Sequence, residues 1–248
     1  NVITTGLVGT PFVDFDPGPG VYNLTSMSAF ILKLDPNGNF VWAKQFLAVP
    51  DCSGAGEWGY GIELDAGGNI HVTGFFQGQV DFDPGPGTFF LQSVTDGSRS
   101  YNEAFVAKLD PAGNFIWAKQ MARAVPTTLY GLGVAIDVDA NGNVYTVGIF
   151  SETTDFDPGT GTYNMSATAW NDAFLSVLDN AGNFVAAKKI AGGDNSDWPN
   201  SVNVDAGGNV YISGHFWGTA DFNPCTPINN IISFGVEDAF FMKYAVFS

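Results

Sequence analysis

The sequence is short of cysteine, of basic residues and of long apolar runs, and each shortage excludes a class of protein. Only Cys52 and Cys225 occur among 248 residues, which excludes a framework of several disulfide bonds. Nine basic residues stand against 25 acidic ones, so the chain repels phosphate backbones and we expect no nucleic-acid partner. No apolar run approaches the ~20 residues of a membrane-spanning helix, so the chain is not expected to span a membrane.

Turn residues are abundant and arranged as an internal repeat. The 31 glycines and 13 prolines punctuate short apolar runs, and 15% of the residues are aromatic, which argues against disorder. Three blocks recur in the same order about four times. An Asp-Phe-Asp-Pro-Gly block occupies 14–18, 81–85 and 155–159, with an altered copy at 221–224; a second block occupies 29–44, 104–119 and 173–188 and begins again at 239; an Asp-x-x-Gly-Asn turn occupies 65–69, 139–143 and 205–209.

Each repeat predicts four antiparallel strands. In the second repeat, strand A lies near Gly61–Leu64, B near Ile70–Phe76, C near Ala104–Leu109 and D near Phe115–Met121. Tight turns join A to B and C to D, because glycine accepts the positive φ of a hairpin and aspartate bonds back to the turn backbone. Four such strands are the pattern of a β-propeller blade, with all tight turns on one side and all long loops on the other. We expect the long-loop side to be the working surface.

The predicted fold is all-β, a β-propeller or an arc of one, with about four blades over approximately 1–50, 51–124, 125–191 and 192–248. The first blade lacks strand A and the last lacks strand D, so the terminal blades are incomplete. Three arrangements stay open: an arc of a larger ring, blades completed by a partner, or a four-bladed ring. Unpaired terminal strands favour pairing with other chains or self-assembly.

The combination of VDFDPGPG, AFxxKLDxxGNFxWAK and xDAGGNxYxxG resembles the bacterial β-propeller repeats called SBBP, which occur in large secreted or surface proteins of Bacteroidetes-type bacteria. The resemblance covers essentially the whole chain. It implies a propeller fold and an extracellular or cell-surface location, and it brings no catalytic residues. The fourth repeat departs from the pattern at Asn223 and Cys225, which stand in place of Asp and Gly.

The acidic blocks are candidate calcium sites. Two carboxylates stand two residues apart in each block, at Asp14 and Asp16, Asp81 and Asp83, and Asp155 and Asp157. Carboxylate oxygens are the ligands that Ca²⁺ prefers, although the bidentate glutamate of an EF-hand is missing from each block. Asp-Pro-Gly is also an ordinary turn, and the phenylalanine between the aspartates would then fill an apolar gap between blades. Ca²⁺ is therefore the candidate cofactor, and plain turns are the competing interpretation.

Two tryptophans are candidates for stacking on a ligand. Trp58 and Trp198 occupy equivalent positions in the predicted D–A loops, with Leu132 at the same place in the third repeat. Loop aromatics stack on sugar rings, and half-buried loop anchors are the alternative. Trp42 and Trp117 recur within strand D, which predicts packing between neighbouring blades.

The remaining reactive residues form no catalytic pattern. His71 and His215 fall at different positions of their repeats, and the chain has no HExxH, CxxC, phosphate loop or ordered Ser-His-Asp set. Cys52 and Cys225 both fall in predicted long loops, and a disulfide bond between them would require a small ring. We predict that the chain is not an enzyme.

The sequence thus favours a secreted, non-enzymatic structural, adhesive or assembly module of a bacterial cell surface. A carbohydrate-binding propeller that uses Trp58 and Trp198, with glycans as partners, is the first alternative. A polysaccharide-active enzyme is the second, because two carboxylates on one face suffice for glycoside hydrolysis.

Overall fold

The computed structural model describes residues 1–10, 12–24, 28–49, 56–97, 100–121, 123–124, 130–168, 170–193, 196–223 and 229–244. Within these ranges the chain consists of β-strands joined by turns and loops, with no helix. The part of the chain described therefore offers no helix that could cross a membrane.

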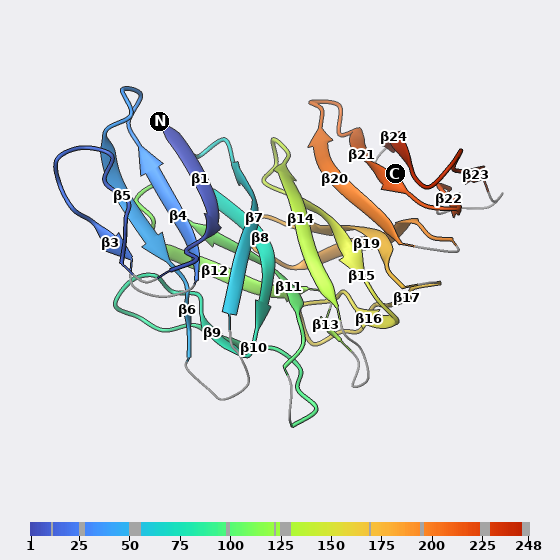
Figure 1. The fold of residues 1–248 in the computed structure, drawn as a ribbon, viewed down its shortest axis with the longest axis horizontal. Helices are drawn as coiled ribbons and strands as arrows, with labels where there is room; N and C mark the ends of the chain where they lie inside the picture. The colour runs from blue at the N-terminus through green and yellow to red at the C-terminus, as the bar shows by residue number, and fades with distance from the viewer. Residues whose placement is uncertain are drawn as a thin grey trace.

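Four antiparallel sheets, here called units 1 to 4, stand side by side in chain order (Figure 1). Unit 1 consists of β1 (Val2–Leu7), β4 (Ala29–Leu34) and β5 (Phe40–Gln45), and unit 2 of β7 (Gly56–Leu64), β8 (Ile70–Gln77), β11 (Glu103–Leu109) and β12 (Phe115–Met121). Unit 3 consists of β14 (Gly131–Val138), β15 (Val144–Phe150), β18 (Asp172–Leu178) and β19 (Phe184–Ala191), and unit 4 of β20 (Asp197–Val204), β21 (Val210–Phe216) and β24 (Asp238–Tyr244).

The sheet order confirms the predicted A-B-C-D blades. Units 2 and 3 pair in the order β7-β8-β11-β12 and β14-β15-β18-β19. Unit 1 contains strands B, C and D, and unit 4 contains A, B and C, as predicted. The chain is thus an all-β propeller arc. The first and last units stand at opposite ends of the row, so of the three arrangements left open by the sequence the closed four-bladed ring is excluded (Figure 1).

The tight turns are built by one repeated set of hydrogen bonds. In the turn at 65–69, Oδ1 of Asp65 accepts the N–H groups of Gly67 and Asn69, both at 2.9 Å, and Gly68 has a φ of 78°. A positive φ is costly for any residue with a Cβ, so glycine is required there. The same bonds recur around Asp35, Asp110, Asp139, Asp179 and Asp205. The turns that follow β14 and β20 lie at the upper edge in Figure 1.

Small sheets that the sequence did not predict lie at the long-loop side, and two of them link neighbouring units (Figure 1). They are formed by β2 (Val13–Asp14) and β3 (Asn23–Leu24); β6 (Leu47–Ala48), β9 (Gln79–Asp81) and β10 (Phe90–Gln92); β13 (Arg123–Ala124), β16 (Thr153–Asp155) and β17 (Asn164–Ser166); β22 (Thr219–Asp221) and β23 (Asn230–Ile232). β6 leaves unit 1 and pairs with β9 of unit 2, and β13 likewise connects unit 2 to β16 of unit 3. Gly193 and Ala220 form the corresponding bridge between units 3 and 4.

The hydrophobic core lies between the units. One cluster joins Ile31 of unit 1 to Val72 of unit 2, and the next joins Val106 of unit 2 to Val144 of unit 3. A third cluster spans units 3 and 4. Each unit therefore depends on its neighbours for burial of its faces, as expected for a repeat architecture.

Candidate interaction surfaces

The aspartates of the acidic blocks shape their own loops. Oδ1 of Asp81 accepts N–H groups from Asp83 at 3.0 Å and Phe89 at 2.7 Å, which closes the loop over its whole length. Oδ1 of Asp83 then accepts the N–H of Gly85 at 2.8 Å. The blocks at 14–18 and 155–159 repeat all three bonds, and Asp221 of the altered copy accepts the N–H groups of Asn223 and Asn229.

The phenylalanine is part of the core in the second, third and fourth blocks, whereas Phe15 of the first block is partly buried. Phe82 is fully buried, and its ring centroid lies 4.9 Å from that of Phe105 in its own unit and 4.9 Å from that of Phe46 in unit 1. Phe156 and Phe222 make equivalent ring contacts in units 3 and 4. The prediction that this residue fills a gap between blades is confirmed.

The calcium hypothesis at these aspartates receives no support from a shared cluster. No group of three or more His, Cys, Asp or Glu side chains is placed to hold a metal ion within the described ranges. Each block offers two carboxylates with one oxygen already engaged by loop N–H groups. Calcium binding there stays a prediction.

Trp58 and Trp198 lie in strand A, near the starts of β7 and β20. The prediction that they lie in D–A loops is therefore wrong. Strand A begins earlier than expected because a β-bulge between Gly59 and Gly61 lets the pairing with β8 continue to Gly56. The equivalence of the two tryptophans is confirmed, since Trp58, Leu132 and Trp198 pair with matching positions of their B strands.

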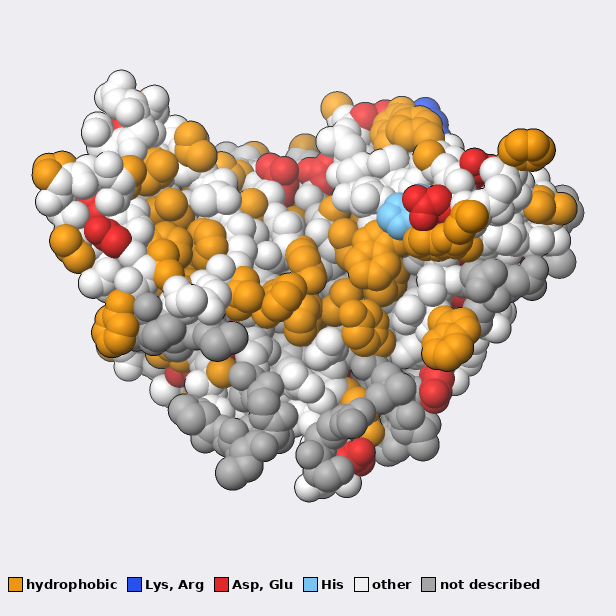
Figure 2. All heavy atoms as spheres, viewed as in Figure 1, with side chains coloured by type: hydrophobic (Ala, Val, Ile, Leu, Met, Phe, Trp, Pro, Cys, Tyr) orange, Lys and Arg blue, Asp and Glu red, His pale blue; other side chains and the backbone are white. Residues whose placement is uncertain are grey.

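Trp58 belongs to an exposed aromatic cluster. It is 41% exposed, and its ring centroid lies 5.5 Å from that of Phe75 and 6.1 Å from that of Tyr60, which is 46% exposed. Hydrophobic side chains gather across the middle of this face of the molecule, in the region of β7, β14 and β20 (Figure 2). Trp198 is partly buried, and Leu132 is buried. Tyr60 and Phe75 could not be grouped with Trp58 from the sequence, because their contact depends on the strand register.

The strand D tryptophans pack between units, as predicted. Trp117 Nε1 donates to the carbonyl oxygen of Asn180 in unit 3 at 3.2 Å. Trp42 of unit 1 lies so close to Gly113 of unit 2 that a Cβ there would stand 3.2 Å from its ring.

The two histidines lie at different positions of strand B, as predicted. His71 is fully buried, with Nε2 3.4 Å from Oδ2 of Asp65. Burial and the charge of Lys108 lower the pKa of His71 to about 4, so it is neutral at pH 7. His215 is partly exposed, and its Nδ1 lies 3.0 Å from Oδ1 of Asn200. Cys52 and Cys225, and with them the predicted disulfide bond, lie outside the described residues.

Carboxyl groups are buried between units at the long-loop side. Glu57 is fully buried, and neither of its side-chain oxygens has a hydrogen-bond partner among the described residues. Burial raises the pKa of Glu57 to about 8, and the nearby N–H groups of Ala29 and Ala48 oppose this only in part. Nothing in the sequence distinguished Glu57 from a surface glutamate.

The junction of units 3 and 4 buries two carboxyl groups. Asp172 Oδ2 lies 3.1 Å from Lys189 Nζ and accepts the N–H of Thr168 at 2.8 Å. Asp197 is also fully buried, and no described residue donates a hydrogen bond to its carboxylate oxygens. Burial and the neighbouring Asp172 raise the pKa of Asp197 to about 7, while Lys189 opposes the shift.

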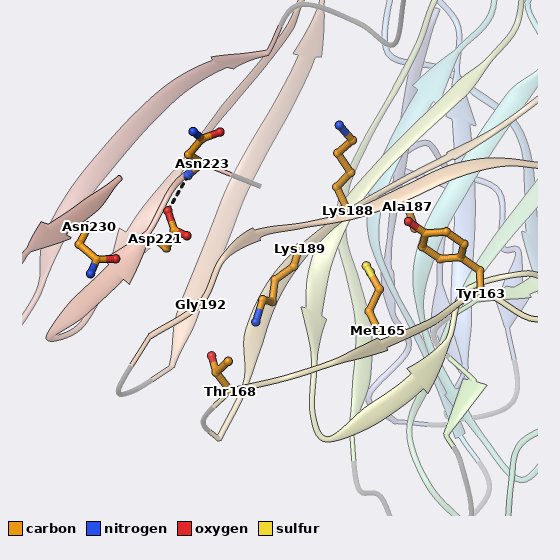
Figure 3. A pocket seen from close by; sticks show the side chains of 10 residues that line it. All are labelled: Tyr163, Met165, Thr168, Ala187, Lys188, Lys189, Gly192, Asp221, Asn223 and Asn230. Atoms are coloured by element: carbon orange, nitrogen blue, oxygen red, sulfur yellow. Dashed lines mark hydrogen bonds between the residues drawn. The ribbon is translucent and has the colours of Figure 1, made fainter. Parts of the chain in front are cut away.

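A cavity of about 490 Å³ opens beside this acidic pair. It lies between β19, which carries Lys188 and Lys189, and Asp221, Asn223 and Asn230 of unit 4, and the remaining lining residues are Tyr163, Met165, Thr168, Ala187 and Gly192 (Figure 3). Ammonium, amide and carboxylate groups in one cavity suit a small polar ligand. Lys189 is already held by Asp172, however, so one of the two positive charges is neutralised within the protein.

Comparison with known proteins supports the propeller fold and little beyond it. No protein-family model matches the chain. An uncharacterized WD repeat-containing protein, L264, of Acanthamoeba polyphaga mimivirus is 34% identical over 132 residues, which are 51% of this chain and 8% of that protein. WD repeats are four-stranded propeller blades, in agreement with the sheets described above. Because the match spans only 8% of the viral protein, it says nothing about the activity of the whole.

Among solved structures, a protein of unknown function from Bacteroides caccae is similar over 92% of this chain and 73% of its own. The sequence identity is 8% and the TM-score is 0.29, too low to support an argument.

Proposed function

We propose that this chain is a secreted, non-enzymatic module with a structural, adhesive or assembly role at a bacterial cell surface. The observation that carries the proposal is the open face of unit 4, where Phe241 of β24 is 73% exposed at a position that units 1 to 3 bury. A repeat unit whose apolar contact face is exposed is suited to bind another protein surface. The resemblance to SBBP repeats supports the extracellular setting.

Binding rather than catalysis is favoured by the use of the carboxylates. The repeated aspartates, such as Asp65 and Asp81, accept backbone N–H groups and build turns and loops. The enzyme alternative is tested by incubating the chain with polysaccharides. Release of sugar that disappears in Asp197→Asn but persists in Asp205→Asn would show an enzyme, because Asp197 has the raised pKa of a general acid.

The adhesive or assembly role predicts that the purified chain binds to itself or to bacterial envelope fragments. A fluorescently labelled chain should sediment with envelope fragments and should self-associate as its concentration rises. A chain that does neither, at any concentration up to the millimolar range, would refute this role.

Carbohydrate binding is the second candidate, and the exposed cluster of Trp58, Tyr60 and Phe75 favours it. Aromatic faces stack on the C–H faces of sugars, and the net charge of −16 favours neutral glycans over acidic ones. Affinity gels that contain neutral polysaccharides should retard the wild type and Trp170→Ala but not Trp58→Ala. Trp170, which is 81% exposed and lies elsewhere, is the control. An unretarded wild type would remove this candidate.

A further inference from the structure

One position of strand C faces the next unit at all three junctions. It is occupied by Ile31, Val106 and Leu175, which pair with matching B-strand residues and are 0%, 0% and 1% exposed. Each belongs to the hydrophobic cluster that joins its unit to the following one. In unit 4 the same register position holds Phe241, opposite Ser213, and it is 73% exposed.

A lysine two residues further along strand C also reaches the next unit. Lys33 Nζ donates to the carbonyl oxygen of Pro111 at 2.6 Å, and Lys108 Nζ donates to Oδ1 of Asn180. Both acceptors occupy the same place in the C–D turn of the following unit. Lys243 has the equivalent position in unit 4, and its Nζ lies 5.2 Å from the ring centroid of Tyr211. Unit 4 thus carries both the apolar and the polar contact of an inner junction.

The opposite end of the row exposes the complementary face. Val2 and Thr4 of β1 match Ile70 and Val72 of β8 in register, and the latter two are fully buried against unit 1. Val2 is 54% exposed, and Thr4 is exposed as well. The C–D turn of unit 1 places Pro36 where unit 2 has Pro111. Unit 1 therefore offers the surface that each inner unit offers to its predecessor.

We propose that the outer face of unit 4 binds unit 1 of a second copy of this chain, head to tail, through the same contacts that join the units within one chain. Phe241 packs against Val2 and Thr4 of the second copy, and Lys243 donates to the carbonyl oxygen of its Pro36. The contact joins two different faces, so it either closes a ring or continues into a longer assembly. This inference rests on the proposed assembly role and names its partner and surface.

Sedimentation velocity over a concentration series tests the contact. The wild type should associate, and Phe241→Ser should weaken association at least tenfold, because an exposed anchor at the centre of an interface is removed. Phe90→Ser is the matched control, since Phe90 is 49% exposed on the small sheet of unit 2 and should not change association. Lys243→Met should weaken association several-fold. Unchanged melting temperatures will show that these exposed substitutions leave the fold intact.

A mixing experiment tests the head-to-tail direction. Thr4→Arg blocks the unit 1 face, and Phe241→Ser blocks the unit 4 face, so each variant alone should be monomeric. Their mixture should form a one-to-one dimer through the two intact faces, which no symmetric interface predicts. Association that survives Phe241→Ser would refute this contact and leave the assembly role to another surface. A monomeric wild type would refute the contact, and only the additional loss of envelope binding would refute the proposed function.

Discussion

The turn side and the long-loop side of the junctions both bury ionisable groups, but they satisfy them differently. On the turn side, Lys108 Nζ lies 3.1 Å from Asp65 Oδ2, and Asp65 also binds Asn69. On the long-loop side, the carboxyl groups of Glu57 and Asp197 are buried with no hydrogen-bond partner among the described residues. Both sides are linked by hydrogen bonds, but only the long-loop side carries buried carboxyl groups that lack a partner and oppose folding when ionised.

The largest effect is expected from the apolar packing of the long-loop side. Phe82→Ala removes a fully buried ring that contacts three other phenylalanines, so it should lower the free energy of unfolding by about 3–5 kcal/mol. Phe90→Ala, at a 49% exposed ring, should change it by less than about 1 kcal/mol. Urea unfolding measures both. Similar losses in the two variants would show that the acidic-block phenylalanine is not a core residue.

The next effect is expected on the turn side. Asp65→Ala removes the carboxylate beside buried Lys108 and should lower the free energy of unfolding by about 2–3 kcal/mol. Asp179→Ala removes the same turn bonds without a lysine partner, so its loss should be clearly smaller. Equal losses in urea unfolding would mean that the ion pair contributes nothing beyond the turn.

A stabilising effect is expected at Glu57. Its pKa is about 8 in the folded chain and ordinary in the unfolded one, so the folded state binds more protons between about pH 4.5 and 8 and stability falls as the pH rises. Glu57→Gln should therefore raise the free energy of unfolding at pH 8 by about 2 kcal/mol and should make no difference at pH 4. Asp197→Asn should act in the same direction with a smaller gain, because Lys189 lies near Asp197. A gain that is equal at pH 4 and pH 8 would contradict the titration.

The smallest effect is expected from calcium. The acidic blocks use one oxygen of each aspartate for loop N–H groups, and no described cluster of three acidic side chains is present. If the blocks bind the ion, excess chelator should lower the melting temperature by only a few degrees, because each block offers just two carboxylates. An unchanged melting temperature with calcium and with chelator would show that the blocks are plain turns.

The strands and the blade order were predictable because their signals are local. An aspartate, a glycine and an asparagine within five residues contain all the bonds of a tight turn, so the sequence alone locates strands B, C and D. The start of strand A was missed because glycine-rich 56–61 reads as a loop, and only pairing with β8 makes it a strand. The short strands β6 and β13 were missed because they pair with the following unit, and the hairpins such as β9–β10 were missed because two or three residues carry too little pattern.

The site residues were harder to predict because burial and contact depend on neighbouring units. From the sequence, Glu57 and Asp197 cannot be distinguished from surface acids, and only the strand register shows that they are buried between two sheets. Phe241 was accessible to sequence reasoning, since alignment of the fourth strand C with the first three matches it to Ile31, Val106 and Leu175. What the alignment could not show is that nothing in the described chain covers it.

The small strands between units bear on how the row responds to force. As the chain leaves unit 1 it is immediately hydrogen-bonded to unit 2 through β6 and β9, and β13 and β16 do the same one unit later. Force applied along the backbone therefore acts first on the hydrogen bonds between two units, and only then on the outer strand of either unit. Neighbouring units should therefore bear the force together and unfold cooperatively rather than one at a time.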